Sequence, residues 1–338
     1  MASRPAALRR ALQFSLRHSR PSTFSSSSSI RSFSSTTPSL APPNPTPDYA
    51  IPDPSRPTHF GYETVTESEK RERVAGVFTS VAESYDRMND LMSFGWHRIW
   101  KDHFVASLNP GFTPLTPDPD PRAPQHILDI AGGTGDIAFR MLHTAHTLNS
   151  NPSVRVTISD INPAMLTVGK QRSTALPASQ QAALTFLEAN AEDLTRTKPL
   201  SSTSPTTSSI PDASVDLYTV AFGIRNFSNI PAALREAHRV LKPGGVFACL
   251  EFSKADKWTP LFTAAYREWS FRAIPLIGQL VAGDRESYQY LVESIERFPS
   301  QREFRDMIVD AGFAVGGQGW EDLTGGVAAV HKGMKPRE

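Results

Sequence analysis

A glycine cluster between an apolar run and a helical pattern is the feature that most constrains how this chain can fold. Residues 126–138 read His-Ile-Leu-Asp-Ile-Ala-Gly-Gly-Thr-Gly-Asp-Ile-Ala. The run 127–130 is typical of a buried strand, and the pattern from Asp136 onward is typical of a helix. Glycines at such a junction let a ligand approach the backbone and the free N–H groups of the helix N-terminus. The segment therefore predicts the nucleotide-binding turn of an open α/β sheet.

Two classes of ligand fit this turn. The spacing Gly133-x-Gly135-x-x-Ala138 matches a dinucleotide fingerprint, although so short a match is weak evidence. Asp129 ends the strand directly before the glycines, where a carboxylate would repel a pyrophosphate and attract the ammonium and sulfonium of S-adenosylmethionine. A structural role, in which Asp129 only accepts N–H groups of the turn, fits the residue equally well.

Further apolar runs alternate with helical patterns after this turn, which predicts a doubly wound parallel sheet. Four more strands are expected at 154–159, 184–187, 215–222 and 246–252, and two late strands near 314–318 and 327–331. The stretch 196–214 is rich in Ser, Thr and Pro, so we expect it to form a surface loop.

Polar residues follow the second and third of these strands. Asp160 ends the second strand, where an acid of this fold hydrogen-bonds ribose hydroxyls. Asp160 also suits an N-cap of the helix that begins at Asn162-Pro163, and the two roles are compatible. Asn190 follows the third strand and is a candidate either for the adenine edge or for capping a turn.

The N-terminal region has the composition of an organelle transit peptide. Six arginines and many serines precede Pro47, with no acidic residue among them. We expect a mitochondrial transit peptide over 1–33, a disordered linker over 34–60 and the folded domain over 61–338, which begins with a helical cap from about Glu67. A basic arm for nucleic acid is the alternative. Without the six arginines the net charge falls from +1 to about −5, which argues against a nucleic-acid partner.

Other sequence features exclude several classes of site. No window reaches the roughly 18 apolar residues of a membrane span. Cys249 is the single cysteine, so disulfides and cysteine zinc sites are excluded, and its apolar neighbours predict a buried thiol. The nine histidines lack metal-ligand spacing.

Ten sequence blocks occur here in the order that a known family has them. The chain from about His59 to Lys335 resembles the ubiquinone/menaquinone C-methyltransferases. The matching blocks are residues 85–90, 93–101, 128–136, 160–166, 190–192, 221–226, 239–245, 250–253, 283–295 and 311–313. Together with the mitochondrial leader, the blocks resemble the coenzyme Q branch of this family.

The resemblance implies a class I S-adenosylmethionine-dependent methyltransferase fold, a Rossmann-like seven-stranded sheet whose last strand is antiparallel. It implies that S-adenosylmethionine is the cofactor and assigns its contacts to Thr134, Asp160 and Asn190-Ala191. Together with the glycine turn, the predicted cofactor-binding residues are Asp129, Gly133, Thr134, Gly135, Asp160, Asn190 and Ala191. Some family members have a serine where this chain has Ala221, so that contact would be lost or made by backbone.

The implied reaction is C-methylation of the ring of a polyprenylated benzoquinol, 2-methoxy-6-polyprenyl-1,4-benzoquinol, in ubiquinone biosynthesis. A free phenol has a pKa of about 10, and a neighbouring cation would lower it. Arg225 is the predicted cation, with Asn226 as a hydrogen-bond partner and Tyr85, beside Asp86, as the next candidate for ring contact or proton removal. His97 and Glu251 follow, and the sequence leaves the base open.

The resemblance also implies partners and a location. The protein would attach peripherally to the matrix side of the mitochondrial inner membrane, among the other subunits of the coenzyme Q synthesis complex. Segment 271–281 and the aromatic block near residue 90 would line an apolar channel for the polyprenyl tail. A homodimer is left open. The rival classes are a nicotinamide-dependent oxidoreductase, supported by the glycine spacing, and a non-catalytic scaffold.

Overall fold

The structure is a computed structural model that describes residues 53–81, 90, 93–112, 123–200, 208–254, 268, 269, 272, 275, 276, 279 and 285–337. The described residues lie within one compact unit, Pro47–Glu338. The predicted transit peptide, most of the predicted linker and Tyr85 with Asp86 lie outside them, as do most of segment 271–281 and most of the block near residue 90.

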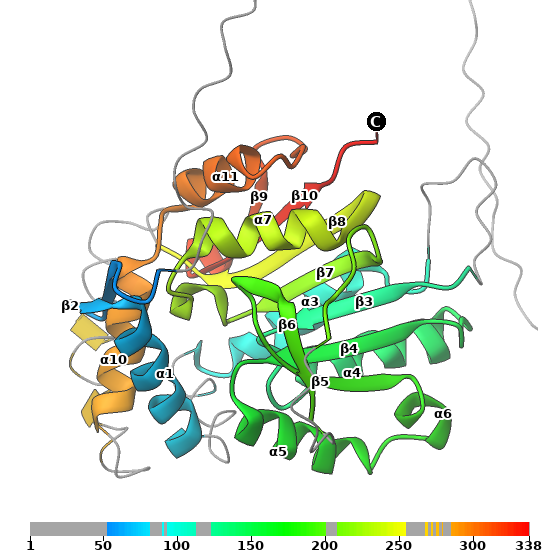
Figure 1. The fold of residues 1–338 in the computed structure, drawn as a ribbon, viewed down its shortest axis with the longest axis horizontal. Coiled ribbons are helices and arrows are strands. Elements are labelled where there is room, and N and C mark those ends of the chain that lie inside the picture. Colours follow the sequence, from blue (N-terminus) through cyan, green and yellow to red (C-terminus); the bar gives the residue numbers. More distant parts are fainter. Residues whose placement is uncertain are drawn as a thin grey trace, which may run out of the picture. The chain divides into compact units, whose positions relative to one another are not determined.

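Within this part of the chain, eight strands form the central sheet in the order β6-β5-β4-β3-β7-β8-β10-β9 (Figure 1). Strands β3, β4, β5, β7 and β8 run parallel to one another, and β10 is antiparallel to both of its neighbours. The strands are β3 His126–Ile130, β4 Arg155–Asp160, β5 Leu184–Asn190, β6 Asp193–Pro199, β7 Val215–Ala221, β8 Leu241–Phe252, β9 Trp320–Leu323 and β10 Ala328–Met334.

The predicted fold class is confirmed, but two details of the sheet were wrong. The sheet has an additional edge strand, β6, where the sequence predicted that a loop begins at Arg196. Leu194 is fully buried and Thr197 bonds to Ser208, so this stretch has a place on the sheet despite its loop-like composition. The first late strand is β9 rather than 314–318. Gly317 and Gly319 have the left-handed backbone conformation, which makes the stretch before β9 a turn.

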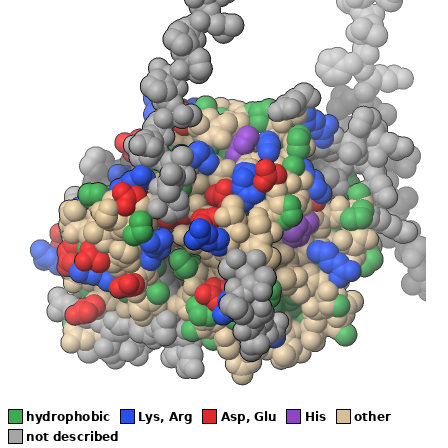
Figure 2. Space-filling model, in the orientation of Figure 1, with side chains coloured by type: hydrophobic (Ala, Val, Ile, Leu, Met, Phe, Trp, Pro, Cys, Tyr) green, Lys and Arg blue, Asp and Glu red, His purple; other side chains and the backbone are tan. Residues whose placement is uncertain are grey.

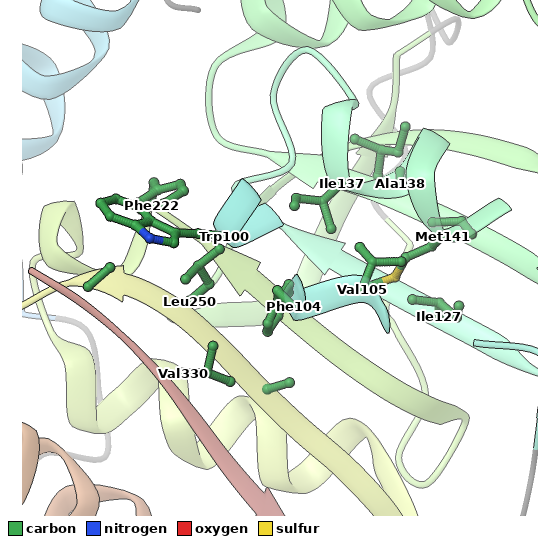
Figure 3. Packing of buried hydrophobic residues seen from close by; sticks show 14 of the residues in the cluster. Trp100, Phe104, Val105, Ile127, Ile137, Ala138, Met141, Phe222, Leu250 and Val330 are labelled. Carbon is green, nitrogen blue, oxygen red and sulfur yellow. The ribbon is translucent and has the colours of Figure 1, made fainter. Parts of the chain in front are cut away.

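Helices cover both faces of the sheet. Side chains of α3, α4, α5 and α10 join one hydrophobic cluster, and those of α7 and α11 join another. Figure 3 shows Trp100 and Phe104 of α3 beside Phe222, Leu250 and Val330 of the sheet. The helices are α1 Glu67–Val81, α3 Trp96–Leu108, α4 Asp136–Leu142, α5 Pro163–Ser173, α6 Ala178–Gln181, α7 Ile230–Val240, α10 Arg285–Arg297 and α11 Gln301–Asp310.

The ordered domain begins before residue 61, which corrects the predicted linker boundary. Strands β1 (Pro57–Phe60) and β2 (Glu63–Thr66) form an antiparallel hairpin directly before α1. The ring of Phe60 stacks on Tyr290 of α10 with centroids 4.1 Å apart. Thr58 Oγ1 donates a hydrogen bond to the carbonyl of Ser228 at 3.2 Å. These long-range contacts hold a segment whose local composition favours a linker.

Acidic and basic side chains are interspersed over the visible face of the molecule (Figure 2). Among the helices that the structure describes, none is both long and apolar enough to cross a bilayer.

Candidate active site

A cleft opens where the strand order reverses. The chain proceeds from β3 to β4 and β5 on one side, then returns to β7 and β8 on the other. The carboxyl ends of β3 and β7 therefore lie side by side, which is where ligands bind in open α/β sheets. The cleft encloses about 1110 Å³, solvent at its mouth included.

The backbone is unusual at the ends of these two strands. Ala131, after β3, has φ 53°, and Phe222, after β7, has φ 56°. Residues other than glycine rarely adopt this left-handed region, and strained residues often cluster at functional sites. A Cβ on Gly223 would lie 2.5 Å from Cβ of Ala131, so only glycine lets the two turns approach this closely. All three residues line the cleft.

Asp129 places a buried carboxylate in the cleft wall. Its Oδ1 accepts a hydrogen bond from Thr219 Oγ1 at 2.7 Å, whereas Oδ2 has no hydrogen-bond partner among the described residues. Asp129 is 1% exposed, and this burial raises its pKa to about 7, with Asp136 and Asp160 adding repulsion. A buried oxygen of this kind is costly unless a ligand supplies a donor or a cation. The site therefore suits a cationic group and repels a pyrophosphate.

Asp160 lies at the neighbouring strand end and also lines the cleft. Burial raises its pKa to about 6. The N-cap of α5 is Asn162, whose Oδ1 accepts from the backbone N–H groups of Ala164 and Met165. Asp160 Oδ1 accepts the backbone N–H of Asn162 at 2.9 Å. The helix cap is thus supplied by another residue, and Asp160 faces the cleft.

The remaining predicted cofactor residues divide into two groups. Gly133, Thr134, Asn190 and Ala191 line the cleft. Gly135 is not among the lining residues; with φ 85° it is the N-cap position of α4, and its contact with the cofactor stays a prediction. Ala221, the position where some family members have serine, lines the cleft as well.

Lys101 is a cleft residue that the sequence analysis missed. It lies on α3, is 4% exposed, and its Nζ is 2.8 Å from Oδ2 of Asp136. The same ammonium lies 5.9 Å from the ring centroid of Phe222. A cation thus shares the cleft with the two acids at the strand ends. The local sequence does not predict this role, because Lys101 lies on a helix that precedes the first strand of the sheet and not at the end of a strand.

Arg225 and Asn226, predicted to act together, occupy different environments. Asn226 lines the cleft, but the side chain of Arg225 is fully buried outside it. Arg225 Nη1 lies 2.7 Å from Glu251 Oε1 and donates to the carbonyl of Phe222 at 2.6 Å. The prediction that Arg225 faces the crevice was therefore wrong, because a buried carboxylate holds its guanidinium behind the turn.

Two further candidates for the base, His97 and Glu251, lie outside the cleft. His97 is buried beside Ser93, and burial lowers its pKa to about 4. Glu251 is paired with Arg225, and burial raises its pKa. Neither residue is among those lining the cleft.

Helix α1 forms one side of the cleft through Arg71, Val74 and Ala75. The helix is fixed to the loop after β7, because buried Lys70 donates from Nζ to the carbonyl of Phe227 at 2.8 Å. The N-terminal helical cap that the sequence predicted is therefore a wall of the site.

Comparisons with known proteins agree with this architecture. The model of the ubiE/COQ5 methyltransferase family matches residues 65–335. A Schizosaccharomyces pombe protein named 2-methoxy-6-polyprenyl-1,4-benzoquinol methylase, mitochondrial, is 50% identical over 282 residues, which cover 83% of this chain and 85% of that protein. A Nitrobacter hamburgensis protein named ubiquinone/menaquinone biosynthesis C-methyltransferase UbiE is 46% identical, covering 83% and 98%. The crystal structure of the [4+2]-cyclase SpnF, 14% identical with a TM-score of 0.51 over 79% of this chain and 96% of that one, shares the fold alone.

Proposed function

Because this chain belongs to the ubiE/COQ5 methyltransferase family, we propose that it methylates a ring carbon of 2-methoxy-6-polyprenyl-1,4-benzoquinol with S-adenosylmethionine as donor. The observation that carries the proposal is the cleft at the ends of β3 and β7, where the buried, unpartnered Oδ2 of Asp129 calls for a cation. The relatives' names supply the acceptor.

The cleft residues fit the parts of the donor. Asp129 would attract its cationic groups, and Lys101 would pair with its carboxylate. Asp160 would hydrogen-bond the ribose hydroxyls, and Asn190 with Ala191 would contact the adenine. When bound, S-adenosylmethionine supplies an electrophilic methyl group on a sulfonium. The carboxylate of Asp129, when ionised, disfavours the pyrophosphate of a dinucleotide at the glycine turn.

The acceptor side of the cleft lies after β7. Phe222 and Asn226 line it there, an apolar ring beside an amide. Asn226 would donate an N–H to a quinol oxygen and so stabilise the phenolate, the electron-rich form whose ring carbon attacks. Holding the ring in line with the methyl group, at about 3 Å, lowers the barrier by several kcal/mol. Tyr85 stays our candidate for a further ring contact.

The location and partners form part of the same proposal. The eukaryotic relatives are named mitochondrial, and the Arg-rich leader of this chain supports the same compartment. A polyprenylated substrate resides in a bilayer, so we place the protein peripherally on the matrix side of the inner membrane. We place it there beside the other enzymes of the coenzyme Q synthesis complex.

Calorimetry of the full chain with S-adenosylmethionine and with NAD tests the donor. We expect S-adenosylmethionine to bind, Asp160→Ala to lose most of the affinity, and Asp306→Ala, an exposed acid of α11, to retain it. A quinol methylation assay with the wild type then tests the acceptor. Binding of NAD instead would support an oxidoreductase, and binding of neither by folded protein would leave only a scaffold.

A further inference from the structure

We propose that Tyr290 is a positioning residue for this methyl transfer: its hydroxyl fixes the side-chain amide of Asn226 so that the amide N–H groups face the cleft. The inference rests on the proposed function, and it adds a residue of α10, an element that contributes nothing to the described wall of the cleft.

The contact between the two side chains determines the direction of the amide. Tyr290 Oη donates a hydrogen bond to Asn226 Oδ1 at 3.0 Å. Asn226 is 9% exposed and lines the cleft. An asparagine amide has an acceptor at one end and two donors at the other. With the acceptor end held by Tyr290, the donor end is the one left for a ligand.

Tyr290 is itself held by burial and by a stacked ring. It is 4% exposed, and its ring stacks on Phe60 of the N-terminal hairpin with an interplanar angle of 12°. Phe60 in turn lies under the guanidinium of Arg73, 5.5 Å from the ring centroid. Burial raises the pKa of Tyr290 above the usual value of about 10 for a tyrosine, so the hydroxyl remains protonated and acts as a donor.

The backbone of Asn226 is held by separate interactions. Its N–H donates to the carbonyl of Gly223 at 3.0 Å within the short 3-10 helix Ile224–Asn226. The neighbouring Arg225 is fixed by its ion pair with Glu251. Removal of the Tyr290 hydroxyl should therefore leave the turn in place and free only the rotation of the amide.

A rotated amide would alter the chemistry of the site. Deprotonation gives the quinol oxygen a negative charge and makes the ring carbon a better nucleophile, so an N–H stabilises the reactive phenolate and a carbonyl oxygen repels it. An amide that is present but no longer oriented should raise the pKa of the bound phenol and lower the phenolate fraction, and turnover with it, on the order of tenfold.

The test is Tyr290→Phe in the full chain, which keeps the stacked ring and removes only the hydroxyl. We expect kcat for quinol methylation to fall about tenfold, with KM for the quinol and the affinity for S-adenosylmethionine changed less than twofold. The matched control is Tyr218→Phe, a fully buried tyrosine of β7 that packs on Phe247 and should keep the wild-type kcat. An equal fall in both variants, or none in Tyr290→Phe, would overturn the inference.

Coupling to Asn226 separates positioning from general destabilisation. On an Asn226→Ala background, Tyr290→Phe should have no further effect on kcat, because the amide that it positions is gone. Multiplicative losses would contradict the proposal. The side-chain amide ¹⁵N signal of Asn226 should also shift in Tyr290→Phe and not in Tyr218→Phe.

These readouts distinguish the two proposals. If the wild type does not methylate the quinol, the proposed function fails, and the amide signal still reports whether Tyr290 orients Asn226. If the wild type is active and Tyr290→Phe equals it, the positioning role is refuted and the proposed function stands.

Discussion

Asp129 has a proposed role in binding the donor and a cost to the ligand-free fold. Its carboxylate is buried with one oxygen unpartnered, and its pKa is raised to about 7. An acid whose pKa rises on folding binds protons more tightly in the folded state, so its contribution to stability decreases as the pH rises from about 4 to 7. A cationic ligand favours the ionised form. Affinity for S-adenosylmethionine should therefore be full above about pH 7 and fall as the pH drops through that value.

Asp129→Asn separates these two effects. The amide keeps the hydrogen bond from Thr219 and removes the buried charge. At pH 8 the melting temperature of the ligand-free variant should therefore exceed that of the wild type, by roughly 2–4 °C for each kcal/mol gained in the free energy of unfolding. Its affinity for S-adenosylmethionine should fall at least tenfold and lose its dependence on pH near 7. Calorimetry from pH 5.5 to 8.5 and thermal melts measure both. A lower melting temperature with unchanged affinity would contradict this account.

Arg225 lies beside the cleft, and we expect it to stabilise the fold. Its fully buried ion pair with Glu251 predicts that Arg225→Met leaves an uncompensated buried carboxylate, at a cost of about 3–5 kcal/mol in the free energy of unfolding. Arg225→Met with Glu251→Met should restore most of that loss, because an apolar pair of similar size is tolerated. Urea denaturation measures both. Normal stability without turnover in Arg225→Met would instead support the catalytic cation that the sequence predicted.

At the scale of elements, the approach of α5 to the glycine turn determines the shape of the donor site. Gly169 lies in the middle of α5, and a Cβ there would be 2.7 Å from the carbonyl oxygen of Gly133. The contact is with backbone, so one of the two segments would have to shift. Because residue 169 is a glycine, α5 can pack this closely against the glycine turn.

Gly169→Ala should therefore weaken binding of S-adenosylmethionine by about tenfold or more and lower the melting temperature. Gly76→Ala is the matched control: this glycine lies within α1, and a Cβ there meets nothing within 4 Å. Replacement of an open helical glycine should stabilise the protein by roughly 0.5–1 kcal/mol. Calorimetry and melts of the two variants test the difference, and similar behaviour of both would refute the packing argument.

The edge elements show where local patterns mislead. Strand β1 and strand β6 both come from stretches whose composition favours loops, yet both pair with neighbouring strands. Leu194 of β6 is buried in the core, and Phe60 of β1 stacks on a helix more than 200 residues later in the chain. Such long-range partners override weak local preferences.

At the scale of the whole molecule, the cleft is assembled from distant parts of the chain. The glycine turn, the ends of β4, β5 and β7, helix α1 and Lys101 of α3 all contribute to its wall. The sheet brings them together because β3 lies between β4 and β7. That the polar residues at the strand ends share one cleft could be predicted, since parallel strands place their carboxyl ends at one edge.

The sequence by itself determined the sheet and the acids at its edge: the strand at 126–130, its glycine turn, Asp129 and Asp160 follow from local patterns and spacing. Only the tertiary structure decided which side chains reach the cleft. Glu251 holds the guanidinium of Arg225 outside the cleft, Tyr290 orients the amide of Asn226, and Lys101 reaches the cleft from α3. The physical reason is that periodicity encodes which face of an element is buried, whereas the direction of a polar side chain depends on partners distant in sequence.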